Sequence, residues 1–190
     1  MSYNEGWKNS NMYKSSDFSS ADMSKVKFAK SIMEKIDNWW NKKSDMLIFC
    51  GSVGVGKTYL AHALCKYWAE NVKFPHNQYL FLLEKEIYDH LQPPYNPGFS
   101  PGYELQKLKD IPFIAIDDFG TAKKSEFRDE TMFDVINGRH ISRFPTLITT
   151  NLFLNQIKTN YDPRLYSRLT DIRNTIIELV DEDLRQTVRE

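Results

Sequence analysis

The sequence has little cysteine, no net charge and no long run of apolar residues. Its two cysteines, Cys50 and Cys65, lack the spacing of a metal site, and we interpret both as free thiols. The formal net charge of zero at pH 7 argues against a protein that coats nucleic acid by bulk charge, although a local basic patch stays compatible with it. No apolar run is as long as a membrane span, and no basic-then-apolar leader opens the chain. We therefore expect a cytoplasmic protein with no membrane partner.

The 190 residues suit a single domain with a short polar arm in front of it. Residues 1–17 show no hydrophobic period, so we expect a flexible N-terminal arm there and one domain over residues 18–190. Residues 21–43 place apolar side chains at helical spacing, which predicts a helix that packs Trp39 and Trp40 at the edge of the core. Partner binding by the two tryptophans is the alternative.

Further along the chain, short apolar runs alternate with helical patterns. Strands are predicted at residues 46–50, 79–83, 111–117, 146–150 and 176–180, and helices at 58–70, 84–91, 103–109 and 126–142. The prolines of residues 92–102 exclude regular structure there. Strands that are apolar throughout are typical of parallel sheets covered on both faces. The predicted fold class is therefore α/β, with a five-stranded, mainly parallel sheet and helices on both of its faces.

The stretch GSVGVGKT, residues 51–58, follows the first predicted strand and opens a predicted helix. This is the context of a P-loop, in which glycines let consecutive backbone N–H groups point at phosphate oxygens and the helix N-terminus adds its positive end. Lys57 is expected to reach the β- and γ-phosphates, and Thr58 to offer its hydroxyl to Mg²⁺. The predicted nucleotide-binding residues are Gly51, Ser52, Val53, Gly54, Val55, Gly56, Lys57, Thr58 and Tyr59. The alternative is a glycine turn that has a lysine beside it by chance.

Polar residues follow two further predicted strands. Asp117 and Asp118 end the strand at 111–117: the first is predicted to hold Mg²⁺ through its water shell, the second to orient or deprotonate the attacking water. Asn151 follows the strand at 146–150, and it donates to a phosphate oxygen or positions the water if that strand neighbours the P-loop strand. The alternatives are two exposed acids after a strand and an asparagine that makes a turn. Taken together, these residues predict ATP and ADP as ligands, with Mg²⁺.

Five motifs occur in a fixed order: GSVGVGKTYLAHAL, FIAIDDFG, PTLITTNL, DPRLYSRLTD and DEDLR. In this order they resemble the AAA+ ATPases of the DnaC/DnaI helicase-loader and IstB type, over roughly residues 18–190. The resemblance implies that residues 51–58 are the Walker A loop and that Asp117 and Asp118 are the Walker B acids. It implies a sensor I role for Asn151 and a sensor II role for Arg185, which would contact the γ-phosphate within its own subunit. An exposed arginine in a charged tail is the alternative for Arg185.

The resemblance also implies that Arg168 reaches into the ATP site of the next subunit, with Arg164 as the alternative finger or its neighbour. A guanidinium suits this role, because it offers a planar, permanently charged set of donors to the charge that builds up on a transferred phosphoryl group. The plainer alternative is that both arginines face solvent or pair with Asp162 or Asp171. We expect Arg139, just before the strand at 146–150, to form an intramolecular ion pair, with a subunit interface as the alternative.

A ring or spiral of subunits that forms with ATP, holds single-stranded DNA and acts on a replicative helicase is the function that the resemblance implies. An IstB-like helper of a transposase is the first alternative. A P-loop kinase acting on a nucleoside or nucleotide is the second, and a module that binds ATP only to keep its shape is the third. Candidate DNA contacts combine backbone charge neutralisation with base stacking. They are Tyr95, Phe99, Tyr103, Lys107, Lys109, Lys123 and Lys124, for which a solvated surface and loop packing are the alternatives.

Three departures from the family pattern bear on this function. Asp118 stands where many AAA+ proteins have glutamate, and its shorter side chain predicts slow, switch-like hydrolysis. The chain ends soon after Arg185, which predicts no separate lid domain. Loaders of this type usually carry a helicase-binding domain, whereas only the arm at residues 1–17 and one helix precede the predicted ATPase.

Overall fold

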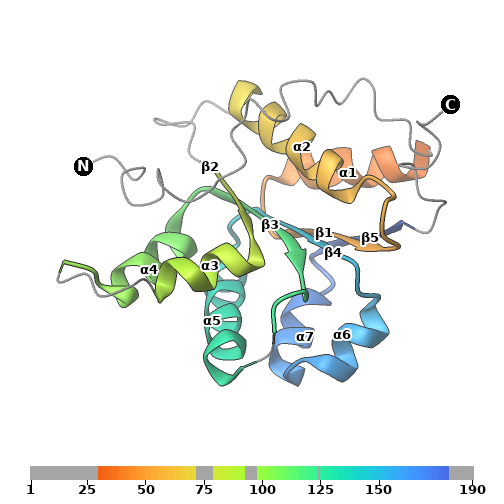
Figure 1. The fold of residues 1–190 in the computed structure, drawn as a ribbon. Coiled ribbons are helices and arrows are strands. Elements are labelled where there is room, and N and C mark those ends of the chain that lie inside the picture. Colours follow the sequence, from red (N-terminus) through yellow and green to blue (C-terminus); the bar gives the residue numbers. More distant parts are fainter. Residues whose placement is uncertain (1–29, 72–78, 93–97, 124, 180–190) are drawn as a thin grey trace, which may run out of the picture.

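The computed structural model describes residues 30–71, 79–92, 98–123 and 125–179 (Figure 1). Strands and helices alternate along this part of the chain. The strands are β1 (Met46–Gly51), β2 (Tyr79–Leu83), β3 (Phe113–Phe119), β4 (Thr146–Thr150) and β5 (Thr175–Leu179). The helices are α1 (Lys30–Lys42), α2 (Lys57–Asn71), α3 (Glu84–Leu91), α4 (Pro101–Asp110), α5 (Glu126–Ser142), α6 (Leu154–Asn160) and α7 (Pro163–Leu169). None of these helices combines the length and the apolar character that crossing a membrane requires.

The strands form one parallel sheet in the order β2-β3-β4-β1-β5. Helices α1 and α2 cover one face, and α3 to α7 cover the other (Figure 1). This arrangement confirms the predicted α/β class with a five-stranded parallel sheet. Strand β4 lies between β1, which leads into the glycine-rich loop, and β3, which carries the two acids.

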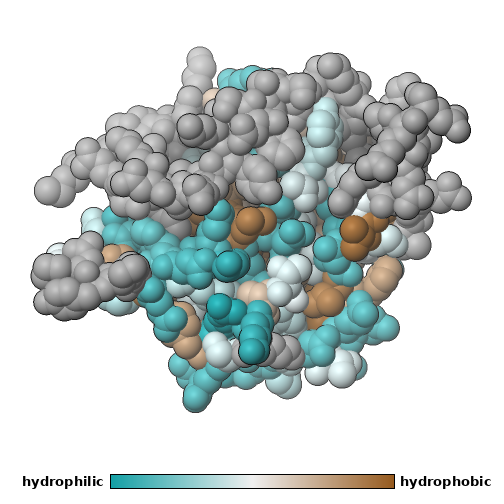
Figure 2. All heavy atoms as spheres, viewed as in Figure 1, coloured by the Kyte–Doolittle hydropathy of each residue, from teal (hydrophilic) through white to brown (hydrophobic). Residues whose placement is uncertain are grey.

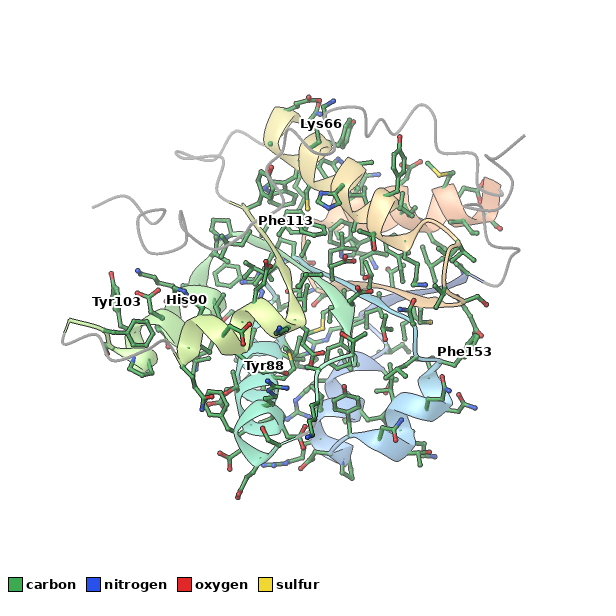
Figure 3. All side chains as sticks on the ribbon, viewed as in Figure 1. Lys66, Tyr88, His90, Tyr103, Phe113 and Phe153 are labelled. Atoms are coloured by element: carbon green, nitrogen blue, oxygen red, sulfur yellow. The ribbon has the colours of Figure 1, made fainter. Side chains whose placement is uncertain are left out.

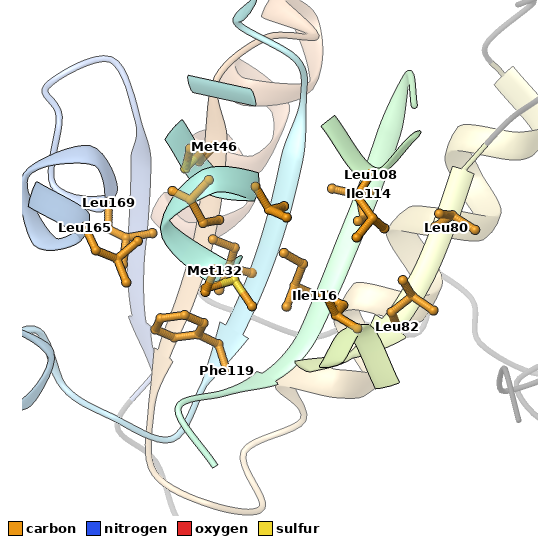
Figure 4. Packing of buried hydrophobic residues seen from close by; sticks show 14 of the residues in the cluster. Met46, Leu80, Leu82, Leu108, Ile114, Ile116, Phe119, Met132, Leu165 and Leu169 are labelled. Carbon is orange, nitrogen blue, oxygen red and sulfur yellow. The ribbon is translucent and has the colours of Figure 1, made fainter. Parts of the chain in front are cut away.

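Alternate side chains of each central strand enter different cores, because successive residues of a strand point to opposite faces. Met46 and Ile48 of β1 belong to the core that α5 and α7 cover, where Figure 4 shows Met46, whereas Leu47 and Phe49 belong to the core under α1 and α2. Both cores are apolar and almost fully inaccessible to solvent, which explains why these strands are apolar throughout. Trp39 is buried, and Trp40 packs on the rings of Tyr67 and Trp68, as predicted for the edge of the core.

Several predicted boundaries are wrong. Strand β3 starts at Phe113 and not at residue 111, because Ile111 donates its N–H to the last turn of α4 and Pro112 has no N–H for the sheet. Helix α4 starts at Pro101, inside the segment predicted to be irregular, since proline is well tolerated in the first turn of a helix. The short helices α6 and α7 follow Asn151, where no element boundaries were predicted.

The two predictions for Arg139 are also wrong. Its side chain is fully buried within the chain, between α4, α5 and the start of β4, and so it lies at no exposed interface. Its donors go to the carbonyl oxygens of Leu108 (2.9 Å), Ile111 (2.8 Å) and Pro145 (2.8 Å) and to the hydroxyl of Thr146 (2.8 Å), and among the described residues it forms no ion pair. A guanidinium placed there satisfies carbonyls that neither the helix end nor the sheet can pair.

Candidate nucleotide-binding site

The glycine-rich loop leaves β1 at Gly51, which lies against the end of β5. Its φ is +130°, and a Cβ atom there would lie 2.0 Å from the carbonyl oxygen of Leu179. The same oxygen accepts a hydrogen bond from the N–H of Ser52 at 3.1 Å. Only glycine fits this close approach of two backbones, so Gly51 anchors the start of the loop to the sheet. Gly54 and Gly56 also have positive φ, and Val55 is buried between them.

Lys57 is the first residue of α2, and its side chain is buried. Its ammonium group donates to the carbonyl oxygens of Gly51, at 3.0 Å, and Ser52. The charge therefore lies inside the curve of the loop, at the helix end where backbone N–H groups already favour an anion. Thr58 and Tyr59 follow in the first turn of α2, both partly buried.

Asp117 meets the first turn of α2 although it comes from β3. Its carboxylate accepts a hydrogen bond from the hydroxyl of Thr58 at 3.1 Å and another from the hydroxyl of Thr149 on β4. Burial raises the pKa of Asp117, and the nearby charge of Asp118 raises it further, whereas the two hydroxyl hydrogen bonds lower it. A buried carboxylate beside a hydroxyl is a set of hard oxygen donors, so it suits Mg²⁺, which takes few protein ligands and fills its remaining positions with water and phosphate oxygens.

Asp118 lies in a β-bulge, where the pairing of β3 with β4 shifts between Ile116 and Phe119. Its φ is +55°, in the left-handed region, and its N–H donates to the hydroxyl of Thr149 at 3.1 Å. A non-glycine residue in this region costs of order 1–3 kcal/mol, and such strain concentrates at functional sites. Bulges interrupt the regular alternation of a strand and so re-aim side chains. Thr149 thus contacts both acids, a role that was not predicted from the sequence.

The loop after the acids is held by Glu84, a second residue that was not predicted for the site. Its buried carboxylate accepts hydrogen bonds from the N–H groups of Gly120 (2.8 Å) and Ala122 (3.3 Å). The hydroxyl of Tyr88, which lies between α3 and α5, donates to its other oxygen at 2.7 Å (Figure 3). The sequence does contain a signal for Glu84, because it is an acid that directly follows the apolar run of a buried strand, and Asp117 likewise follows the apolar run of β3.

Asn151 directly follows β4 and is partly buried. Thr150, the residue before it, is paired with Cys50 of β1 on one side and with Phe119 of β3 on the other. The condition set for Asn151, that its strand neighbours the P-loop strand, is therefore met. The carboxyl ends of β1, β4 and β3 bring Asn151, the glycine-rich loop and the two acids to one edge of the sheet, which is where parallel α/β sheets bind ligands.

Arg164 and Arg168 lie on α7, and within the described residues no hydrogen bond or ion pair joins either to residues 51–58. Arg164 pairs with Asp162 at 3.0 Å and lies over the ring of Phe133. The Nε of Arg168 donates to the side-chain oxygen of Asn137 on α5 at 2.9 Å. Arg164 therefore follows the plainer alternative of pairing with Asp162, whereas Arg168 does not. Arg185 lies outside the described residues.

The candidate DNA contacts are only partly available at the surface. Tyr103 is 60% exposed at the outer edge of the molecule (Figure 3), with the ammonium of Lys107 4.4 Å from its ring. Lys107 also pairs with Glu104 at 2.9 Å, and the ring of Phe99 packs edge-on against His90. Lys109 is partly buried, Lys123 is exposed, and Tyr95 and Lys124 lie outside the described residues.

The fold is similar to those of several solved DNA-replication proteins. DnaI matches with a TM-score of 0.68 and 23% identity over 89% of this chain and 95% of the other. The DnaC helicase loader matches with a TM-score of 0.70 and 22% identity over 86% and 98%. The replication initiator DnaA, bound to AMPPCP and single-stranded DNA, matches with a TM-score of 0.68 and 15% identity over 84% of this chain and 50% of the other.

At these identities the structural likeness shows that this chain and these proteins have the same fold. A search of curated protein sequences finds no significant match. The family described as "IstB-like ATP binding protein" matches residues 6–178, which is most of the chain. The chain therefore belongs to the IstB-like ATP-binding proteins.

Proposed function

We propose that this protein binds ATP with Mg²⁺, hydrolyses it slowly, and uses the ATP-bound state to assemble copies of itself on DNA. The observation that carries the proposal is the convergence of Lys57, Thr58 and Asp117. These residues come from two separate segments of the chain, and they join an ammonium, a hydroxyl and a buried carboxylate at the carboxyl edge of the sheet. ATP binding itself is the property for which the family is described.

Different residues of the site are proposed to contact the phosphates, the Mg²⁺ and the attacking water. Backbone N–H groups of residues 51–58 and the ammonium of Lys57 bind the phosphates, and binding of a phosphate replaces the loop carbonyls as the partner of that ammonium. Thr58 and Asp117 would hold Mg²⁺, which neutralises charge on the β- and γ-phosphates. Asp118 orients or deprotonates the attacking water, and Asn151 contacts the γ-phosphate or that water. The single domain proposed for residues 18–190 contains all of these groups.

We propose that this protein loads a replicative helicase. This role is supported by the order of the five motifs and by the likeness to DnaI and DnaC, which extends over most of both chains. The family match supports an IstB-like helper of a transposase as the second candidate. Affinity capture with a helicase and with a transposase of the same host as separate baits tests the two roles, and retention by the transposase alone would reject the loader.

Single-stranded DNA is the proposed nucleic-acid ligand, and several subunits together would hold it. The described residues on the face shown in Figure 2 are largely hydrophilic, with small, scattered groups of hydrophobic residues among them. The exposed side chains of Tyr103 and Lys123 offer one stacking group and one charge per subunit. Because the formal net charge of the chain is zero, we expect each subunit to contribute few phosphate contacts, so that binding needs ATP-driven assembly and weakens as salt is added.

Two substitutions test the ATPase. Lys57→Ala should abolish binding of a fluorescent ATP analogue, because the phosphates lose their main cationic partner. Asp118→Asn should keep this binding and lose hydrolysis, measured as phosphate release. Asp89→Asn, an exposed acid on α3, is the matched control and should change neither property. Unchanged phosphate release by Asp118→Asn would reject the role given to Asp118.

A further inference from the structure

The two arginines of α7 differ in what balances their charge. The guanidinium of Arg164 is held by the carboxylate of Asp162 through Nε and Nη2, at distances of 3.0 to 3.3 Å. The carboxylate of Asp162 offsets the charge of Arg164 and occupies its Nε and Nη2, so this guanidinium would have to leave or share that partner to bind a phosphate. Arg164 is therefore poorly placed to act on a neighbouring ATP.

Arg168 is bound to a neutral partner instead. Its Nε donates to the amide oxygen of Asn137, on the neighbouring helix α5, at 2.9 Å. Among the described residues it forms no ion pair, and neither of its terminal nitrogens donates a hydrogen bond. A hydrogen bond to Nε fixes the plane of the guanidinium while it leaves both terminal nitrogens and the positive charge for an outside acceptor.

The backbone beneath Arg168 is also held in place. The side-chain amide of Asn174 donates to the carbonyl oxygens of Arg168 (2.7 Å) and Leu169 (3.0 Å), and its oxygen accepts the N–H of Met46 at 3.1 Å. The carbonyls at the end of α7 are thereby tied to the first residue of β1, the same strand that leads into the glycine-rich loop. Arg168 thus starts from a rigid helix end, on which a single side-chain contact is enough to set its direction.

We propose that Asn137 is a positioning residue, which orients Arg168 so that its terminal nitrogens reach the ATP of an adjoining copy of this chain. This inference rests on the proposed function, in which ATP joins neighbouring subunits. A misplacement of about 1 Å can cost a catalytic group about a hundredfold in rate, which is why such an arginine needs a contact that fixes its direction. In this role Asn137 acts through its hydrogen bond with Arg168.

Mixed subunits separate this role from a general effect on folding. The Lys57→Ala protein has no working site but keeps Arg168 to donate, whereas the Arg168→Ala protein has a working site and no arginine to donate. Each alone should be inactive, and a mixture should release phosphate where the donor's Arg168 meets the acceptor's ATP. Asn137→Ala is then placed either in the donor or in the acceptor.

We expect Asn137→Ala in the donor to lower phosphate release by the mixture at least about tenfold. The same change in the acceptor, which has no Arg168 to orient, should leave the rate unchanged. Asp134→Ala, an exposed change on the same helix, is the control in the donor and should also leave it unchanged. Equal rates with and without Asn137 in the donor, or equal losses in both placements, would overturn the inference. An inactive mixture of the two parent variants would instead refute the trans-acting arginine that the family resemblance implies, and the inference with it.

Discussion

Replacing Arg139 with methionine removes a buried charge that several backbone groups need. The guanidinium is the donor to the carbonyl oxygens of Leu108, Ile111 and Pro145 and to the hydroxyl of Thr146, all at 2.8 to 2.9 Å. Methionine fills a similar volume but donates no hydrogen bond. The end of α4 and the start of β4 would then face each other with unpaired carbonyl oxygens.

The expected cost follows from these contacts. Each buried acceptor left without a donor costs about 1–3 kcal/mol, which gives about 3–9 kcal/mol for three carbonyls. Removing the guanidinium also removes the cost of burying its charge, so a loss toward the lower end of this range is expected, about 3–5 kcal/mol. For a domain of this size the loss corresponds to a fall in Tm of about 6–20 °C.

Urea unfolding followed by circular dichroism measures this loss. Arg128→Met is the matched control, because Arg128 lies on the same helix and also donates to a carbonyl, that of Lys123 at 2.7 Å, but at the exposed surface. The control should lose no more than about 0.5 kcal/mol. If the Arg139→Met protein unfolded within about 1 kcal/mol of the parent, the carbonyls would have found other partners and the reasoning would be refuted.

Three further predictions concern the site and the turn after α7. Burial raises the pKa of Asp117, so its charge opposes folding when no cation is bound. The Asp117→Asn protein should therefore unfold at the same or a higher temperature than the parent without Mg²⁺, but it should lose the stabilisation that ATP with Mg²⁺ gives the parent. A parent-like rise in unfolding temperature with ATP and Mg²⁺ would contradict this. Glu84→Ala should lower phosphate release about tenfold while the affinity for the fluorescent ATP analogue stays similar, because only the loop after the acids loses its anchor. Tyr88→Phe is the control, because it removes a hydrogen bond to Glu84 and leaves those between Glu84 and the loop in place. Equal rates of phosphate release for the two variants would argue against Glu84 as the anchor of the loop. A hydrogen bond from Arg173 lowers the pKa of Asp171 to about 2, below its ordinary 3.8, so the ionised carboxylate stabilises the fold above pH 3.8 and this contribution is lost as the pH falls toward 2. Urea unfolding at pH 4 and at pH 2.5 should therefore show a smaller loss of stability between the two pH values for Asp171→Asn than for the parent. Equal losses of stability would argue against this role of Asp171.

The sequence by itself determined the features that are local along the chain. The glycine-rich loop is a contiguous stretch whose residue types follow from backbone geometry and phosphate chemistry, and a strand buried on both faces is apolar throughout wherever it lies in the sheet. For this reason the P-loop, the acids of β3, the ranges of β2, β4 and α5, and the α/β class could all be predicted. The boundaries of β3 and α4 could not, because single proline and capping contacts decide them.

The tertiary structure alone decided which distant residues meet. Strand order places Thr149 against both acids, and the loop after β3 finds Glu84, 36 residues away from Gly120. Arg139 looks like any surface arginine in the sequence, and only the packing of α4 against the start of β4 shows that it is buried. Asn137 and Arg168 are 31 residues apart, and neither has a local pattern that marks it. Such contacts depend on how helices pack across a sheet, and no periodicity within a single segment contains that information.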